Sequence, residues 1–357
     1  MTDISYCMSS FLALRYIEKD DKEFKDGLHH KKTVLPAENS RIKVNTAEDI
    51  DKAIGCQIAQ FRKLRKGIML SGGMDSAIVA SYLSGSDAYT FRFLDGTFQS
   101  EELMRAEYYA DRYGLRLHYV DISWETVNKF LGIVMQRKGA PVHSIEPQIY
   151  QAAMQAKEDG VKMMLIGNSS DPVFGGMDGL LSKDWTLEGF MQRYIFVQPE
   201  EVLKKPVSMQ YLFERYRTAN EKIDFLRFMD EVYSVESSGS YDNAFDAADM
   251  PYFDPYAGLI MGIPLDLSRI RRGESKYLIR ELFRMKYPDV KVPEKNPMPR
   301  PVDIYFENWQ GPKRPEFRNN IDMSRYNGNQ KWLMWCLEQF LNQNDITACD
   351  ENMECMV

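Results

Sequence analysis

The sequence of 357 residues lacks several features that would assign it to common classes of protein. No apolar run reaches the roughly 18 residues that cross a bilayer, so no membrane-spanning helix is expected. The five cysteines are scattered and form no C-x-x-C pair, which argues against a zinc knuckle and favours reduced thiols. The formal net charge of −7 argues against a nucleic-acid surface, which needs clustered lysine and arginine.

The first residues also lack the marks of a secretory leader. Asp3 stands where a leader would be basic, and no small-residue cleavage site follows it. The protein is therefore expected in the cytoplasm, without a membrane partner. Two short basic runs, at 62–66 and 269–272, are interpreted as solvated faces. No internal repeat or low-complexity tract is present, which argues against a solenoid.

From Thr46 onward, short apolar strands alternate with amphipathic helices. Thr46 followed by Asp49 predicts a capping box at the start of the first of these helices. Further helices are expected at 77–83, 101–113 and 146–159, and strands at 68–70, 88–94, 115–120 and 161–166. Strands and helices that alternate with short links are typical of a doubly wound, mostly parallel α/β sheet.

Beyond about Leu180 the pattern becomes helical. Helices are expected at 209–216, 223–233, 276–285 and 330–341. The predicted organisation is an N-terminal segment at 1–60 packed on the rest, an α/β core at 61–185, a C-terminal helical lobe at 186–345 and a tail at 346–357.

The first predicted strand of the core ends in a turn of small and acidic residues, Ser71-Gly72-Gly73-Met74-Asp75-Ser76. Parallel α/β sheets bind ligands outside the carboxyl ends of their strands, where helix N-termini present unpaired N–H groups. Glycines let the backbone approach an anion closely, and serine hydroxyls add donors. The turn is therefore predicted to bind phosphate, although it is neither G-x-x-x-x-G-K-S/T nor G-x-G-x-x-G.

The pattern S-G-G-x-D-S resembles the loop of the ATP pyrophosphatases, which split ATP between its α and β phosphates. The resemblance implies an adenine nucleotide alpha hydrolase-like fold that binds ATP, with Ser71, Gly72, Gly73 and Ser76 at the phosphates. In that family the turn holds the pyrophosphate end while an acceptor attacks the α-phosphorus. Asp75 is then expected to bind Mg²⁺, because a carboxylate beside polyphosphate is repulsive unless a metal lies between them.

A second stretch narrows the resemblance to the asparagine synthetases. Residues 164–176, MLIGNSSDPVFGG, are similar to the S-G-E-G-x-D-E-x-F-G-G segment of that family. The similarity implies that Asp171 is the second Mg²⁺ carboxylate. Gly167 is expected at the nucleotide, and Phe93, at the end of the second predicted strand, is a further candidate. The resemblance covers roughly residues 60–310.

A third stretch, Gly273–Arg280, resembles the G-K-x-x-K-x-x-L-R segment of the same family. This similarity implies that Lys276 meets the pyrophosphate as it departs, where a cation can neutralise growing charge. Weaker similarities are Glu102 after the second strand and PYFD at 251–254, which corresponds to P-F-L-D.

The sequence departs from the asparagine synthetase pattern at two functional points. Thr2 stands where the glutamine-dependent enzymes carry a nucleophilic cysteine, and only about 60 residues precede the turn, so no glutaminase domain is expected. Nitrogen would arrive as free ammonia, from a partner glutaminase, or as an amine on the substrate. Asn168 replaces the family glutamate that is thought to act as base, so another group would have to accept the proton.

The region expected to line the acceptor pocket, 139–150, has no counterpart of the aspartate-binding residues. His143, Ser144 and Glu146 cluster there, and Glu146 or His143 is the candidate replacement for the missing base. Asp249 stands where an arginine is expected just before P-F-L-D. The acceptor is therefore expected to be a carboxylate other than L-aspartate.

The prediction is an ATP-dependent amide ligase that releases AMP and pyrophosphate and joins a small-molecule carboxylate to ammonia or an amine. A homo-oligomer is compatible with it. Two alternatives stay open. One is a tRNA-modifying pyrophosphatase, against which the acidic charge and the missing catalytic cysteine pair count. The other is a nucleotide-binding module without turnover, suggested by Asn168 and Pro172.

Overall fold

The computed structural model describes residues 1–95, 100–294, 298 and 300–346. At its centre lies a five-stranded, entirely parallel sheet in the order β4-β3-β2-β5-β6. Its strands are β2 (Lys66–Met69), β3 (Asp87–Phe93), β4 (Arg116–Ile122), β5 (Met163–Leu165) and β6 (Tyr252–Phe253). The chain moves outward from β2 to β4 and then returns to the other side of β2. The doubly wound parallel sheet is thereby confirmed, with its switch point between β2 and β5.

The four predicted strands all form, and their buried apolar residues explain why. Ile68, Ala88, Val120 and Leu165 are completely buried in the sheet. The fifth strand, β6, was not predicted and lies inside the range assigned to the helical lobe, so the proposed boundary at 185 does not separate sheet from helices. A strand of two residues is too short to show a periodicity in the sequence.

Helices cover both faces of the sheet. On one face, α3 (Met74–Ala80) and α4 (Ser100–Tyr113) lie against β2 and β3 and are backed by α2 (Ala47–Ala59) and α15 (Tyr277–Lys286). On the other face, α6 (Glu146–Glu158) is backed by α5 (Trp124–Lys138) and α13 (Ser234–Ala247). The capping box predicted at Thr46 and Asp49 begins α2 and is confirmed.

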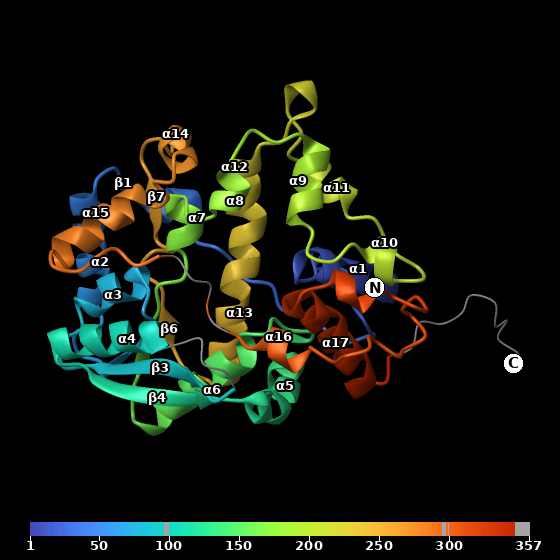
Figure 1. Ribbon diagram of the computed structural model, residues 1–357, viewed down its shortest axis with the longest axis horizontal. Helices are drawn as coiled ribbons and strands as arrows, with labels where there is room; N and C mark the ends of the chain where they lie inside the picture. Colours follow the sequence, from blue (N-terminus) through green and yellow to red (C-terminus); the bar gives the residue numbers. More distant parts are fainter. Residues whose placement is uncertain (96–99, 295–297, 299, 347–357) are drawn as a thin grey trace, which may run out of the picture.

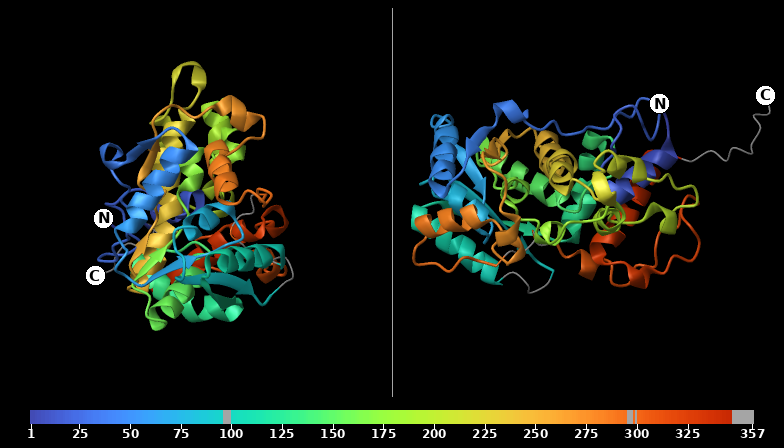
Figure 2. Two further views of the ribbon diagram at one scale, coloured as in Figure 1. Left: turned by 90° about the vertical axis from the view of Figure 1, so that its left-hand side faces the viewer. Right: turned by 90° about the horizontal axis from the view of Figure 1, so that it is seen from above.

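Helix α13 runs between the sheet and a second group of helices (Figures 1 and 2). In that group, α1 (Ile4–Leu14) packs on α17 (Gly328–Gln343), so the start of the N-terminal segment lies against the helical lobe, whereas its end, α2, lies on the sheet side. None of the helices in the described part of the chain is both long and apolar enough to cross a membrane. The predicted tail lies outside the described residues except for Ile346.

The other elements are short. The segment predicted as one helix at 223–233 divides into α12 (Phe225–Phe228) and a π-helical stretch (Met229–Tyr233) that continues into α13. A separate pair of parallel strands joins β1 (Ile42–Val44) to β7 (Leu259–Met261). The remaining helices are α7 (Ser170–Phe174), α8 (Asp178–Leu181), α9 (Leu187–Tyr194), α10 (Pro199–Val202), α11 (Gln210–Glu214), α14 (Leu267–Arg271) and α16 (Val302–Tyr305).

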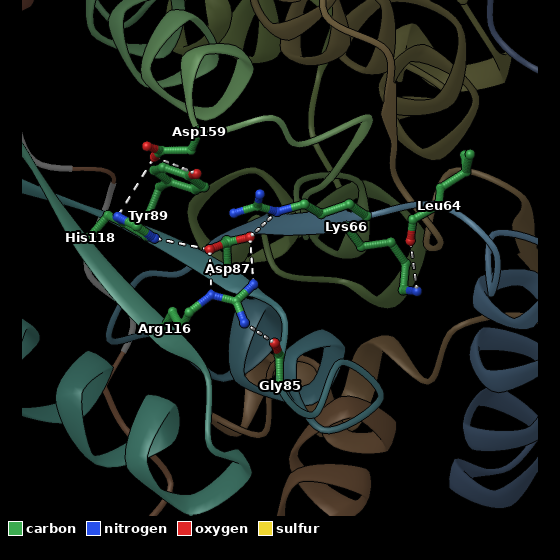
Figure 3. Close-up of polar contacts among 9 residues, drawn as sticks. Leu64, Lys66, Gly85, Asp87, Tyr89, Arg116, His118 and Asp159 are labelled. Carbon is green, nitrogen blue, oxygen red and sulfur yellow. Dashed lines mark hydrogen bonds and ion pairs between the residues drawn. The ribbon is translucent and has the colours of Figure 1, made fainter.

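A cluster of charged side chains around one buried carboxylate holds the amino ends of the strands together (Figure 3). Asp87, which is fully buried at the start of β3, accepts hydrogen bonds from Arg65 at 3.0 Å and Arg116 at 2.9 Å, and its other oxygen lies 3.0 Å from His118 Nε2. Burial alone would raise the pKa of the Asp87 carboxyl, but the two arginines and His118 outweigh it and hold that pKa well below its usual range. Arg65 of the first basic run is therefore structural.

Candidate active site

The predicted phosphate turn connects β2 to α3, and two serines hold it closed. The Ser71 N–H donates to Ser76 Oγ at 3.1 Å, and the two hydroxyl oxygens lie 2.9 Å apart. The Gly73 N–H donates to Ser71 Oγ at 3.2 Å. Ser76 is buried and Ser71 exposed, so Ser76 shapes the turn while Ser71 faces the cavity that the turn lines.

The first turns of α4 pack directly on Gly72. A Cβ atom at this position would lie 2.6 Å from the Glu102 carbonyl oxygen, so only glycine fits. Arg105 Nε donates to the Gly72 carbonyl at 2.9 Å. Burial raises the pKa of the Glu102 carboxyl. Helix α4 thus fixes the Gly72 carbonyl and packs on its Cα.

Three predicted site residues converge at the carboxyl ends of β2 and β5. Lys276, the residue before α15, places its Nζ 2.7 Å from Asp75 Oδ2 and in an ion pair with Asp171. Ser170 Oγ donates to the other Asp75 oxygen at 2.6 Å. The Lys276 side chain is buried; burial lowers the pKa of its ammonium, but Asp75 and Asp171 outweigh this and raise it, so it is a cation.

The two glycines nearest these charges have no room for a side chain. At Gly167, a Cβ atom would lie 3.0 Å from the Asp75 backbone carbon. At Gly176, a Cβ atom would overlap both Asp171 Oδ1 and Lys276 Cε. The close approach of β5 and its following loop to the phosphate turn therefore depends on both glycines.

Residues after β6 position the loop that leads from β5 into α7, the short helix that carries Asp171. Asp254 accepts hydrogen bonds from the Ser169 N–H at 2.7 Å and the Tyr256 N–H at 3.0 Å. Burial outweighs these bonds and raises the pKa of the Asp254 carboxyl to about 6. The Tyr256 hydroxyl donates to the Asp75 carbonyl at 3.1 Å, which links the loop to the phosphate turn.

The site opens into a cavity of about 220 Å³. The phosphate turn lines it together with the charged residues Asp75, Asp171 and Lys276, and the other lining residues include Thr90, Phe91, Gly167, Asn168 and Tyr241. Phe93, a predicted nucleotide contact, does not line it; Phe91, two residues earlier on β3, does. The assignment of Phe93 to the nucleotide therefore stays a prediction.

The two carboxylates suit a magnesium ion. Mg²⁺ typically takes one or two protein carboxylates and completes its shell with water and substrate phosphates. Asp75 and Asp171 present oxygens to a single cation, the Lys276 ammonium, which shows that they can share a charge between them. The described residues contain no group of three or more histidine, cysteine, aspartate or glutamate side chains that could hold a metal ion. The donor set therefore fits Mg²⁺ bound together with a polyphosphate.

The two predicted bases are not part of this cavity. Glu146 is fully buried, where its carboxylate forms an ion pair with Lys138 at 2.8 Å and accepts from Asn243 at 2.6 Å. His143 is also buried, and its Nε2 lies 2.7 Å from an Arg15 nitrogen. Burial, followed by Arg15, holds the pKa of His143 well below its usual value. The Glu146 carboxylate therefore has internal partners in Lys138 and Asn243. The structure brings neither Glu146 nor His143 to the phosphate turn.

Asn168 does lie in the cavity wall, as its place in the motif predicts. Its Nδ2 donates to the Ser237 carbonyl at 3.4 Å and lies 3.3 Å from Ser237 Oγ on α13. An amide at this position fixes α13 to the β5 loop. Sequence reasoning missed Arg105, Tyr241 and Tyr256, which belong to helices or loops whose patterns indicate only packing or exposed faces.

A glycine and serine turn, two carboxylates and a lysine at the switch point of a parallel sheet define a nucleotide-binding α/β site. The family model for asparagine synthase matches residues 46–244, which is more than half of the chain and includes β2 to β5, the turn and Asp171. The chain belongs to the asparagine synthase family.

A protein of Methanocaldococcus jannaschii, provisionally named a glutamine-hydrolysing asparagine synthetase, is 31% identical over 162 residues. The match covers 44% of this chain and 30% of that protein, so the chain spans less than a third of its relative. Two solved structures overlap weakly with this chain. An NMN synthetase from Francisella tularensis is 12% identical, with a TM-score of 0.28, and the overlap covers 71% of this chain and 100% of that one. An NH3-dependent NAD synthetase from Campylobacter jejuni is 13% identical, with a TM-score of 0.25, and the overlap covers 58% of this chain and 94% of that one. Overlaps at this level indicate neither a ligand nor an activity.

Proposed function

We propose that this protein is an ATP-dependent amide ligase that forms AMP and pyrophosphate. In the first half-reaction a substrate carboxylate oxygen attacks the α-phosphorus, and the bond to the bridging oxygen of pyrophosphate breaks. In the second, ammonia or an amine attacks the acyl carbon, an amide bond forms and AMP leaves. The observation that supports this assignment is the convergence of Asp75, Asp171 and Lys276 beside the phosphate turn.

Each residue of the site has a separate role in the first half-reaction. Ser71 and Gly73 bind the outer phosphates, and Asp75 with Asp171 would hold Mg²⁺. A bound Mg²⁺ would neutralise phosphate charge at this position. Lys276 then turns its ammonium toward the departing pyrophosphate, where the negative charge grows during the displacement. Alignment of the acceptor with the nucleotide in one cavity supplies much of the remaining rate.

The second step proceeds without a carboxylate at the position of Asn168. Ammonia or an amine enters in its neutral form, so that its lone pair attacks the acyl carbon directly. The proton leaves the new amide nitrogen after the attack, to water or to the phosphate of AMP. The acceptor is a small carboxylate other than L-aspartate, and its nitrogen donor is ammonia, an amine or a partner glutaminase.

Pyrophosphate release from ATP tests the proposal. Release of pyrophosphate should depend on one member of a panel of carboxylates, and the nucleotide product should be AMP. Release that needs the carboxylate but neither ammonium nor an amine would show that adenylylation precedes transfer. Formation of ADP would contradict the mechanism. Release that ignores every carboxylate but responds to tRNA would favour the tRNA-modifying alternative, and nucleotide binding without any release would favour the module without turnover.

The variant Asp75→Asn provides the matched test of the metal site. It should lower pyrophosphate release by at least about a hundredfold, because a charged ligand and a hydrogen-bond acceptor are lost together. Asp178→Asn is the control, since Asp178 is exposed on α8 and outside the cavity. If Asp75→Asn retains full activity, Asp75 does not hold the metal.

A further inference from the structure

The charges around the cavity are unbalanced for a polyphosphate ligand. Its described lining residues include four carboxylates but only two cations: Asp75, Glu102, Asp171, Glu294, Arg105 and Lys276. Lys276 is already shared between Asp75 and Asp171. Of the described lining residues, Arg105 is therefore the cation that can bind the phosphates without first leaving Asp75 and Asp171, as Lys276 must.

Arg105 is held at the phosphate turn by one of its three nitrogens. Its Nε donates to the Gly72 carbonyl at 2.9 Å, so the guanidinium lies directly beside the turn. Its nearest carboxylate in the described chain is Glu101, whose Oε2 lies 3.6 Å from Nη1. The Glu101 side chain is 83% exposed, so water screens this contact strongly. The Arg105 side chain itself is only 26% exposed.

We propose that Arg105 binds the outer phosphates of the nucleotide, and then the released pyrophosphate, through its two Nη nitrogens. This inference rests on the proposed function and adds a phosphate-binding residue that lies outside the three motifs. A planar guanidinium suits this role because it donates two parallel hydrogen bonds to a phosphate while Nε keeps its bond to Gly72. The ligand class is a polyphosphate with at least two linked phosphates.

The competing explanation is that Arg105 only supports the turn through Gly72. Two variants separate charge from support. In Arg105→Gln the amide can still donate to the Gly72 carbonyl, but the charge is lost. In Arg105→Lys the charge remains, but a single ammonium replaces the two Nη donors of the guanidinium. A phosphate-binding role predicts that lysine rescues affinity in part and glutamine does not; a supporting role predicts no rescue by charge.

Calorimetric titration with inorganic pyrophosphate, ATP and AMP, each with Mg²⁺, measures the effect on the whole chain. Arg105→Gln should weaken pyrophosphate and ATP about 10- to 100-fold, the loss expected for hydrogen bonds to a charged group. AMP, which lacks the outer phosphates, should bind as it does to the unchanged protein. Arg112→Gln is the control, because Arg112 lies in the last turn of the same helix and donates to the Lys286 carbonyl.

The outcomes are distinct. Pyrophosphate affinity that is equal in Arg105→Gln and the unchanged protein would overturn the role of Arg105 alone. Equal losses for AMP and pyrophosphate in Arg105→Gln, or full pyrophosphate affinity in Arg105→Gln with a loss in Arg105→Lys, would show that Arg105 supports the turn and would also overturn it. If the unchanged protein binds neither ATP nor pyrophosphate, the proposed function fails and takes this inference with it.

Discussion

Replacement of Lys276 by methionine should convert the carboxylate pair into a site for free divalent cations. In the structure, the Lys276 ammonium occupies the position between Asp75 and Asp171 that a metal ion would need. Methionine keeps much of the length and packing of the lysine stem but removes its charge. The variant should therefore bind Mg²⁺ or Mn²⁺ without nucleotide, whereas the unchanged protein takes up metal mainly together with the polyphosphate.

The size of the effect follows from the burial of Lys276 and the partial exposure of its partners. Removal of one partner from a fully buried ion pair costs about 3–5 kcal/mol, and the low end of this range applies here because Asp75 and Asp171 are 23% and 24% exposed. If a metal ion recovers about 3 kcal/mol of this, its affinity for the variant exceeds that for the unchanged protein by about a hundredfold. The metal should also stabilise the folded variant by about 2.7 kcal/mol once its concentration reaches about 100 times Kd.

The assay is Mn²⁺ binding followed by electron paramagnetic resonance, with thermal unfolding at rising Mg²⁺ as a second measurement. Lys286→Met is the matched control on the same helix, because Lys286 pairs with Asp51 away from the cavity. Unfolding of the Lys276→Met variant should respond to Mg²⁺, and that of the control should not. Equal Mn²⁺ affinity of the unchanged protein and Lys276→Met without nucleotide would refute the reasoning.

Three further predictions concern stability, the site and the thiols. Asp87→Asn should lower the free energy of unfolding by about 3–5 kcal/mol at neutral pH, because two arginines lose a buried partner. The control Asp121→Asn, at an exposed ion pair, should lower it by less than about 1 kcal/mol; urea unfolding measures both. Because the folded-state pKa of Asp87 is depressed, its contribution is complete above about pH 4, the unfolded value, and is lost as the pH falls below it; the variant should therefore show weaker acid dependence. Gly176→Ala should abolish pyrophosphate release by displacing the charged side chains beside it, whereas Gly55→Ala, with 3.4 Å of clearance, should not. A thiol reagent should label Cys56 in the folded protein and spare the other two described cysteines, which are buried.

The parts of the fold that the sequence predicts well are those with strong local signals. The apolar runs that became β2 to β5 and the capping box at Thr46 need no information from distant residues. Asp75, Asp171 and Lys276 could be assigned because each lies in a motif whose glycines permit close contact. The two residues of β6 lie in the weaker PYFD similarity but form no apolar run of their own, and they are a strand because they pair with β5.

The difference between the expected and the observed surroundings of some site residues also has a physical explanation. Glu146 stands in a polar cluster before a helix, which reads equally well as a base or as an internal ion pair; only its contact with Lys138 distinguishes them. Arg105 appears in the sequence as one more charged residue on an amphipathic helix. Its importance depends on the position of α4 against Gly72, which is a tertiary contact that no local pattern contains.

The separation of the charged residues along the chain affects when the site can work during synthesis. Asp75 and Lys276 are 201 positions apart, and the ammonium joins the carboxylates only after α15 has been made. A nascent chain that ends just after α7 contains both carboxylates but not the ammonium that pairs with them. If the proposed function is correct, such an incomplete polypeptide should release no pyrophosphate until translation has passed Lys276.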